Sequence, residues 1–297
     1  MKVLRTNTEH AASVYTLTAG SDRASFFSGA GDKFVVKWNS DTLEQDAFAV
    51  KLEQPVFSLL HIPSFQLLVI GTSQGDLHII DLVDKKEIRH FTTHRLGIYS
   101  LLYNEKEKQL IVAAGDGSFS IWHLPSFELV RHIPLGEFKL RALALTVDGY
   151  QLAIACGDEK IRIFETFFYN EIYTLQGHKD GVTSLCYHPT KNALMSGGKD
   201  GLLKVWNTKE DYKLLLELPA HYSTIYHVSF SPNKKNMLTT SRDKSYKLWD
   251  AETLEVKSKQ EASGTGHTHS VNAALWLDSE QFITAGDDRK ITLNQVD

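Results

Sequence analysis

The chain has 297 residues, of which 42% are hydrophobic and 23% charged, and its formal net charge is −4. General nucleic-acid and anionic-membrane binders need a basic face to displace counterions, so this balance disfavours both classes. Cys156 and Cys186 are too few for a disulfide framework and suit a reducing compartment. The first residues lack the apolar run of a signal peptide, and we find no 18-residue apolar span, so we expect a soluble, cytoplasmic protein.

The sequence repeats itself from end to end. One position, at the end of a strand-like run, recurs at intervals of 42 to 45 residues. Its seven occurrences are Trp38, Ile80, Trp122, Phe164, Trp206, Trp249 and Asn294. A unit of this size cannot bury a face alone, so a periodic array predicts stacked copies. We therefore interpret residues 1–297 as a single domain, although the length alone would suggest two.

The fifth unit shows the predicted elements most plainly. An alternating run at 182–187 is followed by a turn at 188–192 that contains Pro189. A second run at 193–196 leads to a glycine-rich turn at 197–201, and a third run ends on Trp206 and Asn207. Proline fixes φ in the first turn and glycine supplies positive φ in the second, so the unit predicts three short antiparallel strands.

Two dipeptides carry a family resemblance. Gly177-His178 and Trp249-Asp250, at this spacing and with Asp in the intervening turn, resemble the WD40-repeat family. The resemblance covers all seven units and implies an all-β, seven-bladed β-propeller with four strands per blade. It implies fourth strands at 46–52, 87–91, 128–133, 171–175, 213–218 and 256–260.

The resemblance also implies how the ring closes. Residues Lys2 to Asn7 precede the first unit, whereas the seventh unit stops after its third strand. We expect the segment 2–5 to pair with the last blade as its fourth strand. That pairing would cover two sheet edges that otherwise invite aggregation.

In WD40 proteins a histidine, a Ser or Thr, a turn aspartate and a tryptophan form a hydrogen-bonded network within the blade. This His-Ser-Asp set could suggest a hydrolase triad, but its recurrence together with Trp favours a structural role. The third unit has Val112 at the hydroxyl position, the seventh lacks Trp, and the second and fourth have lost most of the set. The complete sets are His10, Ser28, Asp32 and Trp38; His178, Ser196, Asp200 and Trp206; and His221, Thr239, Asp243 and Trp249.

We find no clear signal for catalysis, a cofactor or a metal. His267 and His269 have a spacing that could offer two metal ligands, but the sequence places no third ligand and His267 already belongs to the network set. No P-loop, GxSxG, HExxH or CxxC pattern occurs. We predict a protein that is not an enzyme and has no metal or cofactor.

One repeat position carries the functional prediction. The residue five after each histidine position is Tyr15, Phe57, Tyr99, Arg141, Thr183, Tyr226 or Asn272. The resemblance places this position at the channel mouth, and neighbouring loops add Lys199 and Arg242. Aromatic side chains and Arg dominate binding hot spots, so we predict a docking site for an acidic or aromatic peptide or loop. The alternative is that some of the aromatic side chains merely plug the channel.

The fourth unit departs from the others after its third strand. Three aromatic residues, Phe167, Phe168 and Tyr169, stand where other units have polar turns. They could form an exposed patch for self-association or for a partner, or they could pack locally.

These patterns predict a non-catalytic protein–protein interaction scaffold. The alternative is a small-ligand-binding or enzymatic propeller that uses the same opening. Nucleic-acid binding is disfavoured by the net charge, and no membrane association is expected.

Overall fold

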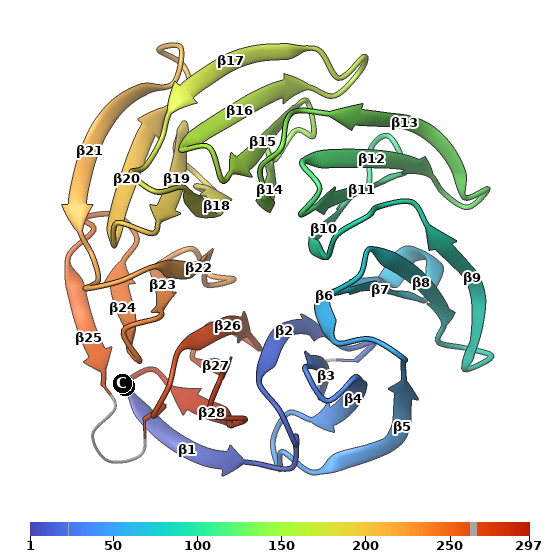
Figure 1. Cartoon of the computed structure of the whole chain (residues 1–297). Helices are drawn as coiled ribbons and strands as arrows, with labels where there is room; N and C mark the ends of the chain where they lie inside the picture. The colour runs from blue at the N-terminus through green and yellow to red at the C-terminus, as the bar shows by residue number, and fades with distance from the viewer. Residues whose placement is uncertain (23, 262–265) are drawn as a thin grey trace.

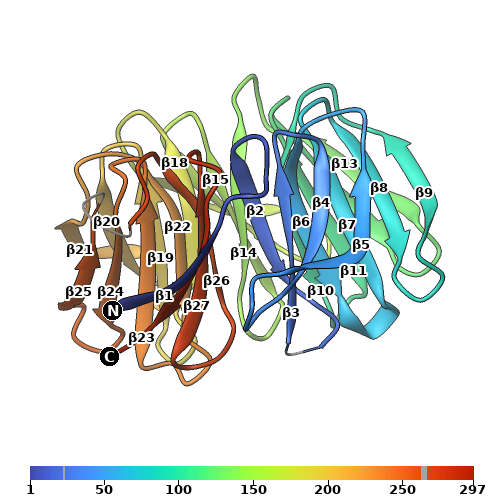
Figure 2. The same cartoon turned by 90° about the horizontal axis from the view of Figure 1, so that it is seen from below.

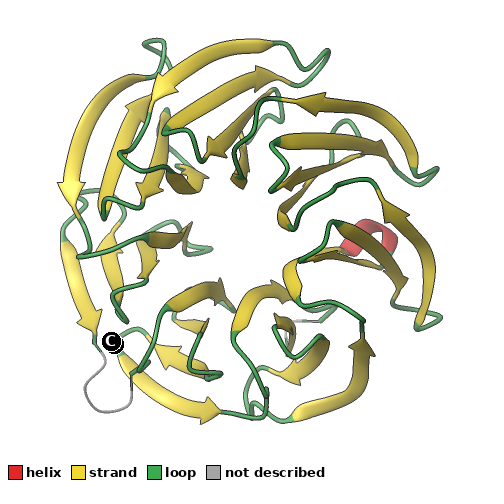
Figure 3. Cartoon of the chain, in the orientation of Figure 1, coloured by secondary structure: helices red, strands yellow, loops and turns green. Residues whose placement is uncertain are grey.

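The computed structural model describes residues 1–22, 24–261 and 266–297. In these ranges the regular structure consists of 28 strands and one short 3₁₀ helix, η1 (Pro63–Phe65) (Figure 3). The strands form seven four-stranded antiparallel sheets that stand as blades around a central channel (Figure 1). The prediction of an all-β, seven-bladed propeller is confirmed.

The blades are numbered here in chain order. Blade 1 contains β2 (Val14–Ala19), β3 (Ser25–Ala30), β4 (Phe34–Asn39) and β5 (Gln45–Lys51). Blade 2 contains β6 (Val56–Ile62), β7 (Leu67–Thr72), β8 (Asp76–Asp81) and β9 (Lys86–Thr92). Blade 3 contains β10 (Ile98–Asn104), β11 (Gln109–Ala114), β12 (Ser118–His123) and β13 (Glu128–Pro134). Blades 4 and 5 contain β14 (Leu140–Leu145), β15 (Gln151–Cys156), β16 (Lys160–Glu165) and β17 (Glu171–Gln176); and β18 (Val182–Tyr187), β19 (Ala193–Gly198), β20 (Leu202–Asn207) and β21 (Lys213–Pro219). Blade 6 contains β22 (Ile225–Phe230), β23 (Asn236–Ser241), β24 (Tyr246–Asp250) and β25 (Val256–Gln260).

Blade 7 is completed by the N-terminal strand. Its strands β26 (Val271–Trp276), β27 (Gln281–Gly286) and β28 (Ile291–Gln295) are followed on the outside by β1 (Lys2–Asn7) (Figure 1). The antiparallel pairing runs from Lys2 opposite Gln295 to Asn7 opposite Ile291, so it extends two residues beyond the predicted segment. The two ends of the chain consequently lie close together (Figure 2), and the Met1 amino group pairs with the Asp297 carboxylate.

Strand order follows the chain in blades 1 to 6, and in blade 7 it does so apart from the outermost strand β1. The first strand of every blade lies beside the channel, and the later strands are added outward (Figure 1). The fourth strands lie within one residue of the predicted ranges. Among the described residues no helix has the length and apolar character needed to cross a lipid bilayer.

Apolar side chains fill the spaces between neighbouring blades. In one cluster Val69 and Ile79 of blade 2 pack with Val112 and Trp122 of blade 3, and all four side chains are at most 5% exposed. Burying a Val, Leu or Ile side chain stabilises a fold by roughly 1.5–3 kcal/mol. Each blade therefore depends on both of its neighbours for the burial of its faces.

Blade 5 shows the hydrogen-bonded network at its fullest. His178 Nδ1 lies 3.0 Å from Asp200 Oδ1, and His178 Nε2 lies 2.8 Å from Ser196 Oγ. The Trp206 indole N–H donates to the same Ser196 oxygen at 2.8 Å. Asp200 also accepts the backbone N–H groups of Lys179 and Leu202, so one carboxylate joins two loops. Corresponding bonds join His10, Ser28, Asp32 and Trp38 in blade 1 and His221, Thr239, Asp243 and Trp249 in blade 6.

The Asp200 carboxylate is held in its ionised form. Burial alone would raise its pKa, but hydrogen bonds from His178 and from the two backbone N–H groups outweigh burial and keep the pKa below its ordinary value. Removing the carboxylate would leave the His178 ring nitrogen and both N–H groups without this acceptor. Because His178 is buried and cannot bond to water instead, the loss of this acceptor lowers the stability of the fold.

The incomplete blades replace the network in different ways. In blade 3, Ser120 takes the place of the hydroxyl that Val112 lacks: it lies directly opposite Val112 and bonds both His94 and Trp122 at 2.9 Å. In blade 4, Asp158 instead makes a two-pronged ion pair with Arg162, with contacts of 3.0 and 2.6 Å. Blade 7 keeps the bonds of His267 to Asp288 and Thr284. Blade 2 has Leu52, Ile70 and Ile80 at the His, Ser/Thr and Trp positions and an exposed Gln74 at the Asp position.

Asp200→Ala is expected to lower the free energy of unfolding by about 1–3 kcal/mol, because the buried His178 ring loses its hydrogen-bond partner. Thermal or urea unfolding measures the change. Asp41→Ala, at an exposed turn, is the control and should stay within about 0.5 kcal/mol of wild type. If Asp200→Ala keeps the wild-type free energy of unfolding but no longer binds a partner, the structural role assigned to Asp200 would be contradicted.

Candidate protein-interaction surface

A β-bulge occurs at the same place in all seven inner strands. In β2 the pairing passes from Val14 to Thr16, so Tyr15 has no partner on β3. An unpaired bulge residue bends its strand and re-aims its side chain. The bulge residues are the seven predicted from the repeat alignment: Tyr15, Phe57, Tyr99, Arg141, Thr183, Tyr226 and Asn272.

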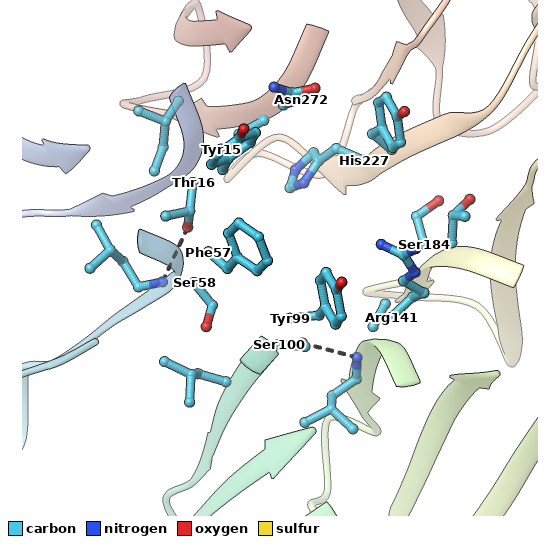
Figure 4. Close-up of a pocket in the computed structure, with 18 of the residues that line it drawn as sticks. Tyr15, Thr16, Phe57, Ser58, Tyr99, Ser100, Arg141, Ser184, His227 and Asn272 are labelled. Carbon is cyan, nitrogen blue, oxygen red and sulfur yellow. Dashed lines mark hydrogen bonds between the residues drawn. The ribbon is translucent and has the colours of Figure 1, made fainter. Parts of the chain in front are cut away.

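These bulge residues surround one opening, which we call the channel mouth. Together with Lys199, Thr224, Arg242 and Asp287 they line a cavity of about 620 Å³. A deeper cavity of about 270 Å³ continues between the inner strands. Figure 4 shows side chains from different blades around this space. The structure thus brings together all nine residues predicted for partner binding, and their role in binding remains a prediction.

Three aromatic rings and one guanidinium form a continuous ladder across blades 1 to 4. The rings of Tyr15 and Phe57 meet edge to face with centroids 5.3 Å apart. Phe57 stacks on Tyr99 at 5.4 Å, and the Arg141 guanidinium lies 4.4 Å from the centre of the Tyr99 ring (Figure 4). Such contacts between rings, and between a cation and a ring, hold these side chains in a fixed arrangement.

Positive charge gathers on one side of the mouth. Lys199 and Arg242 are exposed, and the Lys139 ammonium lies 5.8 Å from the Tyr99 ring centre. In the described part of the chain, no salt bridge involves Arg141, Lys199 or Arg242. Burial raises the pKa of Tyr226, although Arg242 and Arg141 oppose the shift, so its phenol stays a neutral hydrogen-bond donor. The mouth therefore presents cations and O–H donors.

Two of the bulge residues already have partners within the ring. The Thr183 hydroxyl lies 2.7 Å from the Ile225 carbonyl of the next blade. The Asn272 side-chain N–H group donates to the Val14 carbonyl at 3.0 Å and to Asp287 at 2.8 Å. The bonds to Ile225 and Val14 join neighbouring blades, including the first to the last. Thr183 and Asn272 thus line the mouth while also holding the ring together.

The predicted second patch requires a correction. Phe167 and Phe168 are 74% and 55% exposed and meet edge to face at 4.5 Å, but Tyr169 is only 5% exposed. The Tyr169 hydroxyl donates to Gln109 at 2.5 Å, and its ring packs in the core between blades 3 and 4. For Tyr169 the second alternative, local packing, is the correct one, and it does not belong to an exposed patch.

The reason lies in the geometry of the turn. Tyr169 has a φ of 58°, which turns its side chain inward at the end of the loop. The same left-handed position recurs in the turns of other blades, where Leu43, Phe127 and Leu254 also point into apolar clusters. The 42-residue spacing of Phe127 and Tyr169 was the sequence signal that could have identified it.

The histidine pair that suggested metal ligation has another explanation. His267 uses both ring nitrogens within blade 7, at 2.8 Å from Asp288 and 3.0 Å from Thr284. His269 is exposed and contacts Thr268. A different group, Asp76, His78 and His90, has no signature in the sequence, because its members belong to two strands and meet only through the strand register.

Comparison with known proteins adds the family. The family model described as "WD domain, G-beta repeat" matches residues 85–123, 169–207, 212–250 and 258–293, and the chain belongs to the WD40-repeat family. Propellers of this family generally serve as non-catalytic protein-interaction scaffolds. The chain is therefore a WD40 propeller with an aromatic channel mouth.

Several curated proteins are similar over part of their length. Pre-mRNA-processing factor 17 of Saccharomyces cerevisiae is 34% identical over 30% of this chain and 20% of its own length. Protein tipD of Dictyostelium discoideum is 32% identical over 39% of this chain and 18% of its own. Coronin-like protein crn1 of Schizosaccharomyces pombe is 34% identical over 41% of this chain and 20% of its own. This chain thus spans about a fifth of the relatives it matches.

Tyr169→Ala is expected to destabilise the fold by about 3–5 kcal/mol, as deletion of a buried aromatic ring does. Phe168→Ala, one position away in the exposed part of the turn, should change stability by less than about 0.5 kcal/mol. Chemical denaturation of both variants compares the two directly. Equal losses would show that Phe168 packs as tightly as Tyr169 and would contradict the assignment.

Proposed function

We propose that this chain is a protein-interaction scaffold that docks a peptide or loop of a partner on the channel mouth. The observation that carries this proposal is the ladder of Tyr15, Phe57, Tyr99 and Arg141 at the rim of a cavity of about 620 Å³. Interface hot spots are enriched in Tyr and Arg and lie in well-packed, preorganised pockets. The mouth supplies such residues from four neighbouring blades at once.

The chemistry of the mouth favours an acidic partner. Arg141, Lys199 and Arg242 bring three positive charges to the opening. Asp287, the carboxylate that lines the same cavity, is already engaged by Asn272 at 2.8 Å. A carboxylate or phosphate on the partner would complement these cations and speed encounter. Aromatic or aliphatic side chains beside it would pack on the ladder.

A small-ligand function at the same opening is the second candidate. His227 lines the deeper cavity (Figure 4), and its Nε2 is buried without a hydrogen-bond partner among the described residues. Burial lowers the pKa of His227 to about 4, so the ring is neutral at physiological pH. A small polar molecule in the channel could satisfy this nitrogen.

The proposal also covers the domain organisation, a second contact surface and the cellular location of the protein. The ring of seven blades acts as one domain, and the Phe167–Phe168 pair offers a second contact for a partner or for another copy. A reducing, cytoplasmic location is supported by Cys156 and Cys186, which are both free. Burial raises the pKa of each thiol to about 12, which keeps them unreactive.

Affinity capture from native lysate tests the docking surface. The bait is the wild-type chain, a Tyr15→Ala/Tyr99→Ala/Tyr226→Ala variant, or a control Phe167→Ala/Phe168→Ala variant, all folded at the working temperature. A partner lost only from the first variant is the expected result, because that variant removes the rings of the mouth. Equal recovery from all three baits, or loss only from the control, would contradict the mouth as the docking surface.

The charge of the partner is tested separately. Once the captured protein is identified, Arg141→Glu/Arg242→Glu should weaken its binding, and added salt should weaken wild-type binding. Full affinity in the reversed variant would overturn the acidic-partner version of the proposal. If no protein is captured, binding of small metabolites is compared between wild type and His227→Leu. A metabolite that binds wild type but not the variant would support the small-ligand function.

A further inference from the structure

Blade 2 gathers two histidines and two carboxylates on its outer strands, β8 and β9, away from the channel mouth (Figure 1). Asp76 and His78 are two residues apart on β8 and so share one face of the sheet. His90 on β9 lies directly opposite His78 in the strand register, and Glu87 precedes His90 on the same strand, on the other side of a bulge. The register therefore brings four potential ligands or ligand partners together.

The contacts within this group are close. The imidazole rings of His78 and His90 stack with centroids 4.3 Å apart and planes within 5° of parallel. His78 Nδ1 lies 2.6 Å from Glu87 Oε1, which leaves Nε2 as the free nitrogen of that ring. One ligand atom from each of Asp76, His78 and His90 lies within 4.8 Å of the other two.

The separation between His90 and Asp76 points to a shared ion. His90 Nε2 is 3.4 Å from Asp76 Oδ1, which is longer than the usual N–H···O hydrogen bond of about 2.9 Å. Two ligands that each lie about 2.0–2.1 Å from a tetrahedral Zn²⁺ are about 3.3 Å apart. The pair already has the spacing that a tetrahedral ion between them requires.

We propose that Asp76, His78 and His90 bind a divalent transition-metal ion of the Zn²⁺ type. Two imidazoles and one carboxylate are a ligand set that such ions favour, with a fourth position left to water. Glu87 is the positioning residue, because its carboxylate fixes the orientation of the His78 ring and makes its other nitrogen a better ligand. The His90 side chain is 48% exposed, so its ring can tilt away from the His78 ring until the lone pairs of both rings point at one ion, while its Nε2 stays beside Asp76.

The blade network does not account for these histidines. In blade 5 both ring nitrogens of His178 have partners inside the blade, whereas blade 2 has apolar side chains at the His, Ser/Thr and Trp positions of the network. His78 and His90 stand on the outer part of the sheet instead. They are thus available for an ion without loss of the blade's own support.

Calorimetric titration of the untagged chain, residues 1–297, with Zn²⁺ tests the site, with Mg²⁺ as the comparison ion. Wild type is expected to bind one Zn²⁺ and to melt at a higher temperature when it is bound. His78→Ala and His90→Ala should each weaken the affinity at least tenfold. Glu87→Gln should weaken it by about 10- to 100-fold, as loss of a residue that orients a ligand does. Mg²⁺ prefers oxygen ligands and should not compete.

His269→Ala is the matched control, because it removes an exposed histidine outside the group. It should bind Zn²⁺ as wild type does. The melting temperatures of all variants are measured in metal-free buffer, so that a loss of folding is not taken for a loss of a ligand. Equal Zn²⁺ affinity in wild type and in folded His90→Ala, or no binding at one ion per chain, would overturn the proposal and leave the group as a surface ion pair.

Discussion

The architecture depends on the burial of blade faces against one another. A four-stranded sheet with two apolar faces cannot be stable in water by itself, and in this chain each face is covered by a neighbouring blade. The array must therefore close, and β1 achieves this by pairing with β28 in the last blade. Closure fixes the seven inner strands side by side around the channel. The bulge residue of each strand then reaches the same opening, which is how residues far apart in the sequence form one surface.

Variation among the blades shows which parts of this design are interchangeable. The His–Asp network of blade 5, the Asp158–Arg162 ion pair of blade 4 and the apolar filling of blade 2 all support a blade of the same shape. Different side-chain contacts can therefore support the same blade backbone, provided that buried polar groups have hydrogen-bond partners. Surface chemistry can change more freely still. The aromatic ladder on blades 1 to 4 and the histidine pair on blade 2 are both departures of this kind, and both proposals concern such departures.

The sequence predicted the fold well because its signals are periodic and local. Turn residues, alternating runs and a spacing of about 42 residues identify strands without knowledge of the tertiary structure. The channel-mouth residues were found in the same way, because a shared repeat position implies a shared place in the ring. The bulge that aims each of them was not foreseen, since an unpaired residue has no signature in an alternating strand.

What the sequence missed depends on contacts across strands. Ser120 replaces the hydroxyl of Val112 from the opposite strand, and His78 meets His90 only because of the pairing of β8 with β9. In the sequence Tyr169 cannot be told from its exposed neighbours Phe167 and Phe168. In the structure its backbone has a positive φ and its side chain is buried in the core. A register shift of one residue would move Ser120 or His78 to the other face of its sheet.

Site-specific photo-crosslinking tests the central claim most directly. A photoreactive phenylalanine analogue replaces Tyr15 at the channel mouth or Phe168 on the exposed turn of blade 4, and each folded protein is irradiated in native lysate. The account predicts a covalent adduct with one partner protein from position 15, and none with that protein from position 168. An adduct with the same partner from position 168 alone would show that docking occurs away from the channel mouth and would contradict the account.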